Sequence, residues 1–185
     1  MDELPLQGAP NLLNACAAVA LVETCGLAAD ALAEGLRTFE GLPHRQQVVA
    51  RRGGLVFVND SKATNVHAVC AGLAGYERDV VLILGGSGKA EDFAPLRAVM
   101  APVSRVVVIG DEAERIAAAL AGAVPVDRAG TLPEAVRAAA ALAGERGTVL
   151  LSPACASFDM FRDYNERGEV FSAEARRLAA GEGGA

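Results

Sequence analysis

The spacing of apolar residues changes once along the chain, near residue 40. Before that point apolar positions recur at helical intervals, and they predict two helices. The first is expected to run from a cap at Asn11 to a stop at Gly26, and the second to cover residues 28–39. Gly41-Leu42-Pro43 then interrupts the helical pattern, so this tripeptide is the best candidate for a domain boundary.

Beyond residue 44, short apolar runs alternate with helical stretches. Strands are expected over residues 47–50, 55–58, 80–84, 106–109, 124–126 and 148–151, the first two joined as a hairpin through glycines. Helices are expected near residues 65–75, 93–101, 112–121, 132–143 and 166–180, with Thr131 and Glu134 as a capping box. Apolar runs without polar alternation indicate strands buried on both faces. The expected fold class is therefore α/β: a Rossmann-like, doubly wound, mostly parallel sheet behind a short N-terminal helical segment.

Composition and charge narrow the class of protein. The 185 residues suit one domain with a small appendage, and 52% hydrophobic residues argue against disorder. The net charge of −6 disfavours non-specific nucleic-acid binding. Neither a membrane span of about 20 apolar residues nor a secretory signal is visible, so an intracellular, cytoplasmic protein without membrane insertion is expected. The four cysteines form no C-x-x-C pair, and no structural metal or disulfide is expected.

Polar segments follow three of the expected strands directly. They read Asn-Asp-Ser-Lys-Ala-Thr-Asn at 59–65, Gly-Gly-Ser-Gly-Lys at 85–89 and Ser-Pro-Ala-Cys-Ala-Ser at 152–157. In a parallel sheet these segments meet at one edge, where ligands bind. Their lysines, hydroxyls and glycine-rich backbone have the composition needed to hold anions.

Each segment also has a purely structural interpretation. Residues 85–89 are not a Walker A loop, because Ile83 replaces the required glycine and Ala90 the required hydroxyl residue. Alone, this segment is equally typical of a turn with a surface lysine. Asp60 and Ser157 are each also typical of helix caps. The expected convergence of three segments favours binding.

Four segments in order resemble the C-terminal part of the Mur ligase family, and specifically its D-glutamate-adding branch. They are Gly-Leu-Pro-His-Arg at 41–45 and the stretches at 59–65, 85–89 and 151–157. The resemblance extends over residues 4–178, and Asp-Ser-Lys-Ala-Thr-Asn is its specific motif.

The resemblance implies a division of the chain. Residues 1–40 would be the helical tail of the family's central ATPase domain, 41–45 a hinge, 46–180 the C-terminal domain and 181–185 a disordered tail. The UDP-binding domain, the Walker loop, the magnesium ligands and the modified lysine of the family are not among these 185 residues. The chain is therefore expected to be a fragment that is inactive alone.

The resemblance also implies a reaction and its participants. The family forms an amide at the expense of ATP, with Mg²⁺ held by the central domain, through an acyl phosphate that an amino acid attacks. For this branch the partners would be UDP-N-acetylmuramoyl-L-alanine and D-glutamate, in peptidoglycan synthesis.

Residue roles follow from the family by position. In the nucleotide site, Asn11 and Asn14 would contact adenine, and Asp60 would hold the ribose. Arg45 and Lys62 would approach the phosphates, and these two residues are the catalytic candidates. In the amino-acid site, Thr64 and Lys89 would hold the side-chain carboxylate of D-glutamate, and Ser157 with the backbone near Tyr164 would hold its α-carboxylate. Two positions depart from the family. Pro10 stands where histidine is frequent, and Tyr164 where phenylalanine is also found. His44 and His67 carry no assigned chemistry, and exposed or packing roles are expected for them.

Two other functions fit the same fold. A related amide ligase, such as a folylpolyglutamate synthetase, would take a different amino acid, and the Asp-Ser-Lys-Ala-Thr-Asn motif argues against it. A non-catalytic, stand-alone binding module would explain why no Walker loop is present in these 185 residues.

Overall fold

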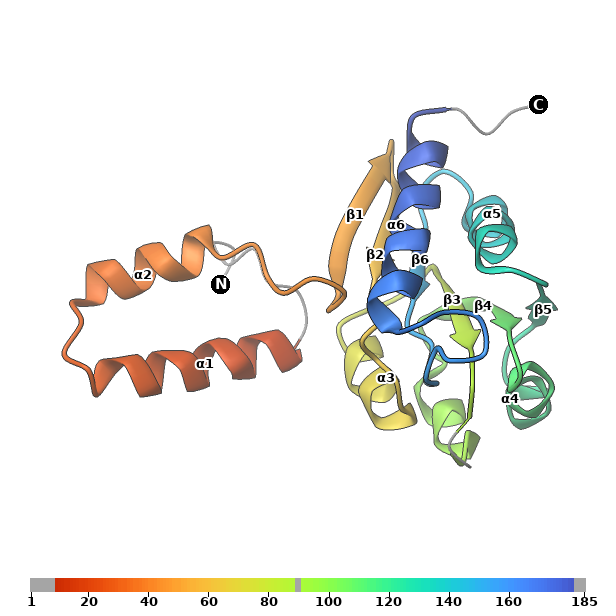
Figure 1. Ribbon diagram of the computed structural model, residues 1–185, viewed down its shortest axis with the longest axis horizontal. Coiled ribbons are helices and arrows are strands. Elements are labelled where there is room, and N and C mark those ends of the chain that lie inside the picture. The colour runs from red at the N-terminus through yellow and green to blue at the C-terminus, as the bar shows by residue number, and fades with distance from the viewer. Residues whose placement is uncertain (1–8, 89–90, 182–185) are drawn as a thin grey trace.

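A six-stranded, mostly parallel sheet forms the centre of the larger part of the molecule (Figure 1). The computed structural model describes residues 9–88 and 91–181. The strand order is β1-β2-β6-β3-β4-β5. The strands are β1 (Gln47–Arg52), β2 (Leu55–Asn59), β3 (Val80–Gly85), β4 (Val103–Ile109), β5 (Val126–Arg128) and β6 (Thr148–Leu151). Only β1 runs antiparallel to its neighbour, β2, and the other neighbouring pairs are parallel, so the expected fold class and hairpin are confirmed.

Helices cover both faces of the sheet. One face carries α3 (Val66–Leu73), the 3₁₀ helix η1 (Ala94–Val99) and α4 (Ala113–Leu120), and the other carries α5 (Leu132–Ala143) and α6 (Tyr164–Ala179). The α5 capping box of Thr131 and Glu134 is present as expected. The stretch 93–101, expected as a helix, forms only a 3₁₀ helix, because Pro102 follows it closely and cannot continue a helix.

The uninterrupted apolar strands divide their side chains between two cores. Along β3, Val80, Leu82 and Leu84 pack with α3, η1 and α4, while Val81 and Ile83 pack with α5 and α6. All five are completely buried. Both faces of a parallel sheet are covered, and this explains why the strands show no polar alternation.

The first two helices form a hairpin that stands out from the sheet (Figure 1). They are α1 (Ala9–Glu23) and α2 (Ala29–Thr38), and α1 approaches the sheet domain at α3. α1 ends at Glu23, three residues before the expected stop at Gly26, which lies in the following turn with a φ of +74°. The prediction that Asn11 caps α1 is wrong, because the helix begins at Ala9; Pro10 is compatible with a first helical turn, so the start moves upstream. No helix within residues 9–88 and 91–181 is long and apolar enough to cross a membrane.

Candidate functional site

The three polar segments that follow β2, β3 and β6 lie side by side at one edge of the sheet. The three strands are neighbours in the order β2-β6-β3, and backbone hydrogen bonds join the segments beyond them. Gly85 N–H donates to the Pro153 carbonyl (2.9 Å) and Ala154 N–H to the Ala63 carbonyl (3.0 Å). We call residues 59–65, 85–88 and 152–157 the edge loops. Their convergence, expected from the sequence, is present in the structure.

Gly85 and Gly86 allow the second edge loop to lie against neighbouring backbone. Their φ values are +123° and +133°, which side chains disfavour. A Cβ on Gly85 would come within 1.9 Å of the Ile109 carbonyl oxygen, and one on Gly86 within 2.2 Å of the Ala156 carbonyl oxygen. The two glycines are therefore required by packing.

Arg167, which the sequence analysis did not single out, ties the first and third edge loops together. Its guanidinium donates to Ser61 Oγ (3.0 Å), the Ser61 carbonyl (2.9 Å) and the carbonyls of Cys155 and Ala156 (3.1 Å each). The side chain is completely buried, and this burial lowers its pKa to about 10, so it stays protonated at neutral pH. A signal was present in the sequence: Arg167 lies on the buried stripe of α6 that includes Phe171 and Ala175.

Asp60 is a buried carboxylate held from two sides. Gln46 donates its backbone N–H to Oδ1 (3.2 Å) and its Nε2–H to Oδ2 (2.7 Å), and Ser152 Oγ donates to Oδ2 (2.8 Å). Tyr76 donates its hydroxyl to Gln46 Oε1 (2.7 Å), so a chain of hydrogen bonds runs from Tyr76 through Gln46 to Asp60. Burial raises the pKa of Asp60 to about 6, although the bonds from Ser152 and Gln46 act in the opposite direction.

The helix-cap interpretations of Asp60 and Ser157 do not hold. Asn65 caps α3 by accepting the Ala68 N–H (2.8 Å), and Asp163 caps α6 by accepting the Glu166 N–H (2.9 Å). The Ser157 residue is buried, and its carbonyl accepts the N–H groups of residues 160 and 161 in the turn before α6.

Lys62 and Tyr164 are in contact across the site. Lys62 Nζ lies 3.7 Å from the centre of the Tyr164 ring, and the Tyr164 carbonyl accepts the Ser61 hydroxyl (2.8 Å). Such a cation over an aromatic face is attractive and orients both groups. Thr64 is half-buried in the same edge loop, where its N–H donates to the Lys62 carbonyl (2.8 Å).

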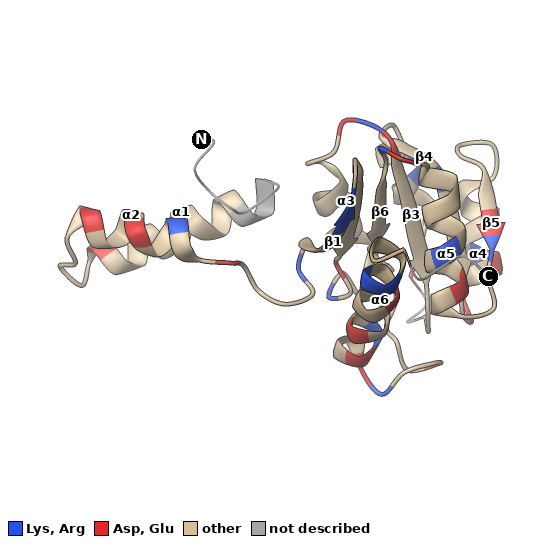
Figure 2. Cartoon of the chain, turned by 90° about the horizontal axis from the view of Figure 1, so that it is seen from above, with Lys and Arg blue, Asp and Glu red and all other residues tan. Residues whose placement is uncertain are grey.

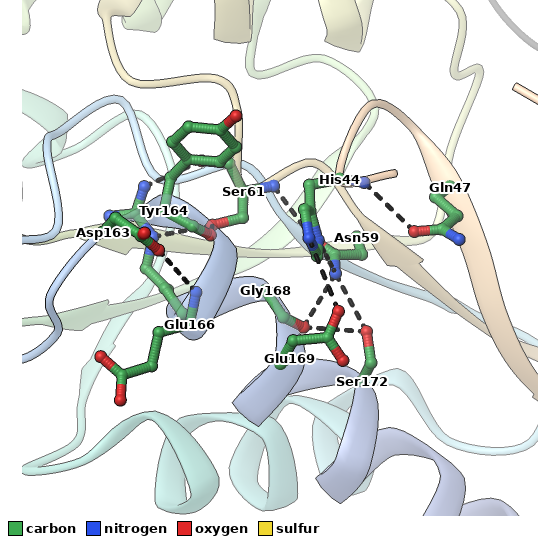
Figure 3. A network of polar contacts seen from close by, with 11 residues as sticks. His44, Gln47, Asn59, Ser61, Asp163, Tyr164, Glu166, Gly168, Glu169 and Ser172 are labelled. Atoms are coloured by element: carbon green, nitrogen blue, oxygen red, sulfur yellow. Dashed lines mark hydrogen bonds and ion pairs between the residues drawn. The ribbon is translucent and has the colours of Figure 1, made fainter. Parts of the chain in front are cut away.

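His44 is buried in a polar network that fixes the end of the linker (Figure 3). Asn59 Nδ2 lies 3.0 Å from His44 Nδ1 and also donates to the Gly168 carbonyl (2.9 Å) and Ser172 Oγ (3.0 Å). A Cβ on Gly168 would stand 2.2 Å from His44 Nδ1, so α6 accommodates the ring only with glycine there. His44 therefore has the packing role expected of it, and His67 is exposed.

The remaining candidates lie near the linker or outside the described residues. Arg45 is exposed, and its charge lowers the pKa of Asp60 slightly. Together with Asn14 it borders an apolar cavity of about 710 Å³ between α1, α2 and the linker. Lys89 and the side chain of Asn11 lie outside the described residues.

Neither a metal-binding cluster nor a disulfide is found among the described residues. Within the described parts of the chain, no group of three or more histidine, cysteine or acidic residues is placed to hold a metal ion. The cysteines are free, with Cys16 and Cys25 exposed on the helical hairpin. Cys155 is buried, and burial raises the pKa of its thiol to about 12.

Sequence comparison finds close relatives. A family model described as "Mur ligase, glutamate ligase domain" matches residues 44–155. The UDP-N-acetylmuramoylalanine--D-glutamate ligase of Methylococcus capsulatus is 51% identical over 179 residues, covering 96% of this chain and 39% of the relative. The protein of the same name from Pseudomonas aeruginosa is 49% identical over 184 residues, covering 97% and 41%. The chain thus spans about two fifths of the length of the curated relatives it matches.

Solved structures share the fold at low sequence identity. UDP-N-acetylmuramate-alanine ligase MurC of Thermotoga maritima matches with a TM-score of 0.75 and 18% identity, over 97% of this chain and 40% of that one. E. coli FolC in complex with DHPP and ADP matches with a TM-score of 0.66 and 24% identity, over 96% and 42%.

Proposed function

Because this chain belongs to the family of Mur ligase glutamate ligase domains, we propose that it is the C-terminal, D-glutamate-binding part of an ATP-dependent amide ligase. The complete enzyme would add D-glutamate to UDP-N-acetylmuramoyl-L-alanine in the cytoplasm, as one step of peptidoglycan synthesis. The observation that carries the proposal is the convergence of the three edge loops, which brings Lys62, Thr64 and Ser157 to one edge of the sheet, where Tyr164 of α6 contacts Lys62.

The reaction has two steps, and both place demands on this edge. The substrate carboxylate takes a phosphoryl group from ATP and becomes an acyl phosphate, with ADP released. The amine of D-glutamate then attacks the acyl carbon, phosphate leaves and an amide remains. Both steps need neutralised phosphate charge, and the second also needs a precisely held amine. Lys62 would supply the charge, and its contact with Tyr164, a residue that we assign to the amino-acid site, supports this role.

The nucleotide residues fit their roles chemically. A carboxylate offers about four lone-pair positions, and Asp60 uses three of them for Gln46 and Ser152. One position is left for a ribose hydroxyl without breaking the existing bonds. Arg45 and Lys62 would approach the phosphates, and Asn14 with Asn11 would contact adenine. Mg²⁺ would neutralise phosphate oxygens, and we place its ligands outside the described residues, which offer no metal-binding cluster.

The amino-acid residues fit a substrate with two carboxylates. Thr64 and Lys89 would hold the side-chain carboxylate, and Ser157 with the backbone near Tyr164 the α-carboxylate. Ser157 and Tyr164 flank the turn that leads into α6, a helix of 16 residues. The N-terminal end of a helix carries partial positive charge and favours a carboxylate.

The proposal is tested in a complete ligase that contains this segment. We expect ADP release that depends on D-glutamate and a product whose mass shows one added glutamate. Replacing Lys89 with alanine should raise the KM for D-glutamate roughly 10- to 150-fold, because a charged hydrogen bond of about 1.5–3 kcal/mol is lost. The KM for ATP should change little. Arg51→Ala is the control, because it removes an exposed charge near the end of β1, at the edge of the sheet opposite the edge loops. Collapse of ATP affinity with normal D-glutamate binding would assign Lys89 to the phosphates instead.

A further inference from the structure

A second cavity lies at the opposite edge of the sheet, where β2 and β6 begin. It has a volume of about 700 Å³ and is formed by the turn between β1 and β2, the second half of α5, the loop into β6 and the end of α6. Ala140, Ala141 and Leu178 supply its accessible apolar wall, over the buried Leu55 and Phe57. Leu55 and Asn59 stand at the two ends of β2, about 13 Å apart at the usual rise per residue, so this cavity is separate from the edge loops.

The walls of this cavity are cationic in an acidic chain. Arg52, Arg137 and Arg146 line it, with Glu145 as the single carboxylate among the described lining residues. The lining has a net charge of +2, or about +1 once the pairing of Arg137 with Glu174 is counted, whereas the chain as a whole carries −6. Such a local excess of one sign attracts ligands of the opposite sign.

The three arginines differ in how far the protein already satisfies them. Arg137 Nη1 is bonded to Glu174 (2.9 Å), so its charge is largely compensated. Arg52 Nη1 makes only a long contact, 3.4 Å, with the Leu178 carbonyl.

Arg146 is exposed, and no hydrogen bond or ion pair joins it to any described residue. The stem packs on the turn at Gly54, where an added Cβ would lie 3.0 Å from Arg146 Cγ. Arg146 and Arg52 therefore line the same cavity with guanidinium groups that the described residues satisfy little, because Arg52 makes only its long contact with Leu178.

We propose that this cavity binds a small organic anion, with a carboxylate or phosphate group on a compact apolar body. A guanidinium donates two parallel hydrogen bonds to either group, and Arg52 and Arg146 are the ones available to do so. The apolar wall receives the body of the ligand. This anion site uses none of the residues assigned to ligation, so a result against the anion site would leave the proposed function unaffected, and the reverse also holds.

The direct test is an NMR titration of the 185-residue chain, followed at the backbone amides of Gly53, Gly54 and Gly144. The probes are phenyl phosphate, benzoate and, as a neutral match, benzyl alcohol. We expect saturable shifts at these glycines with at least one anion, weaker at high salt, and none with benzyl alcohol at equal concentration. Binding of phenyl phosphate would indicate a phosphate ligand, and binding of benzoate would indicate a carboxylate ligand. Absence of saturable shifts with both anions would overturn the proposal, and so would equal binding of benzyl alcohol.

Charge variants make the test specific. Arg146→Gln should weaken binding about tenfold or more, because a charged hydrogen-bonding pair is lost. Glu145→Gln should strengthen binding, because it removes the carboxylate of the lining. Arg51→Gln is the matched control: it removes the same charge from β1 outside the cavity lining and should leave binding unchanged. Glu145 is exposed, so its variant keeps the test decisive if Arg146→Gln fails to fold. Equal affinity in the Arg146 and Arg51 variants would refute the site.

Discussion

Arg167 is a buried cation that is stabilised mainly by carbonyl groups. Three of its four acceptors are backbone oxygens of the edge loops, and the fourth is Ser61 Oγ. The charge of Asp159 also favours the protonated guanidinium, although no ion pair joins the two side chains within the described residues. Because these carbonyls have turned toward one side chain, removing that side chain leaves them buried and unsatisfied.

We therefore expect Arg167→Met to lower the free energy of unfolding by at least about 3 kcal/mol. Arg167→Lys keeps the charge but loses the planar fork, and it should cost less than the methionine variant. Urea unfolding followed by circular dichroism measures both. Arg162→Met is the matched control, since that side chain is 85% exposed and should change stability by no more than about 0.5 kcal/mol. Similar losses at the two positions would show that the Arg167 bonds do not hold the loops.

Asp60 should make stability fall as pH rises. Burial raises its pKa from 3.8 to about 6, so the folded chain binds the proton more tightly than the unfolded chain does. The contribution of Asp60 to the free energy of unfolding then decreases between about pH 4 and pH 6, by an amount on the order of 3 kcal/mol, and does not recover above that range. Asp60→Asn cannot ionise, so its stability relative to the parent chain should improve over this interval. Urea titrations at several pH values test this, and parallel stability curves for the two proteins would contradict it.

Among the elements, the junction between β3 and its edge loop has the tightest geometry. Gly85 and Gly86 lie at positive φ against carbonyl oxygens, whereas an added Cβ on Gly88 would meet only the flexible side chain of Glu112. The three glycines of one short loop therefore differ in what they tolerate.

This difference predicts opposite outcomes for two alanine variants. Gly85→Ala should destabilise the chain by about 3 kcal/mol or more, because the new methyl group clashes with backbone and φ is unfavourable. Gly88→Ala should cost less than about 1 kcal/mol, because Glu112 can move aside. Thermal or urea unfolding of both variants measures the change in the free energy of unfolding. A small loss of stability in Gly85→Ala would mean that the loop has room to relax.

The elements were more predictable from the sequence than the contacts between them. Uninterrupted apolar runs identify the strands, because burial on both faces leaves no polar alternation. The same pattern locates the edge loops, since they follow the strands directly. Arg167, Gln46 and the His44–Asn59 pair were not found, because their partners come from distant parts of the chain and local periodicity carries no record of them. The start of α1 was misplaced because Asn11 is a good cap residue but Pro10 suits the first turn.

For the whole molecule, the linker between the helical hairpin and the sheet is anchored at the end that joins the sheet. His44 is buried, and Gln46 is bonded to Asp60. Arg45 lies between these two fixed residues, so it belongs to the sheet domain while it borders the cavity beside α1 and α2. Figures 1 and 2 show the linker that runs from α2 to β1. Gly41, with a φ of +87°, precedes the anchored part and can absorb a large backbone change.

If the pivot lies at residues 41–43, Arg45 moves as part of the sheet domain and reaches the phosphates only when that domain closes. In a complete ligase, Arg45→Ala should then lower kcat far more than it raises the KM for D-glutamate. Arg45→Lys should restore little activity, because an ammonium cannot replace a bidentate fork. Steady-state kinetics of both variants provides the measurement. A near-normal kcat for Arg45→Ala would reduce this residue to a surface position beside a linker.

The position of β6 has a consequence for how the domain is made. The last strand in the sequence, Thr148–Leu151, lies between β2 and β3 in the middle of the sheet. During synthesis, every earlier strand leaves the ribosome before the strand that joins the two halves of the sheet. Loop closure over such long separations is slow, and unpaired strand edges remain open to wrong partners until it happens. The nascent chain should therefore stay sensitive to proteases, and bound by chaperones, until residue 151 has emerged.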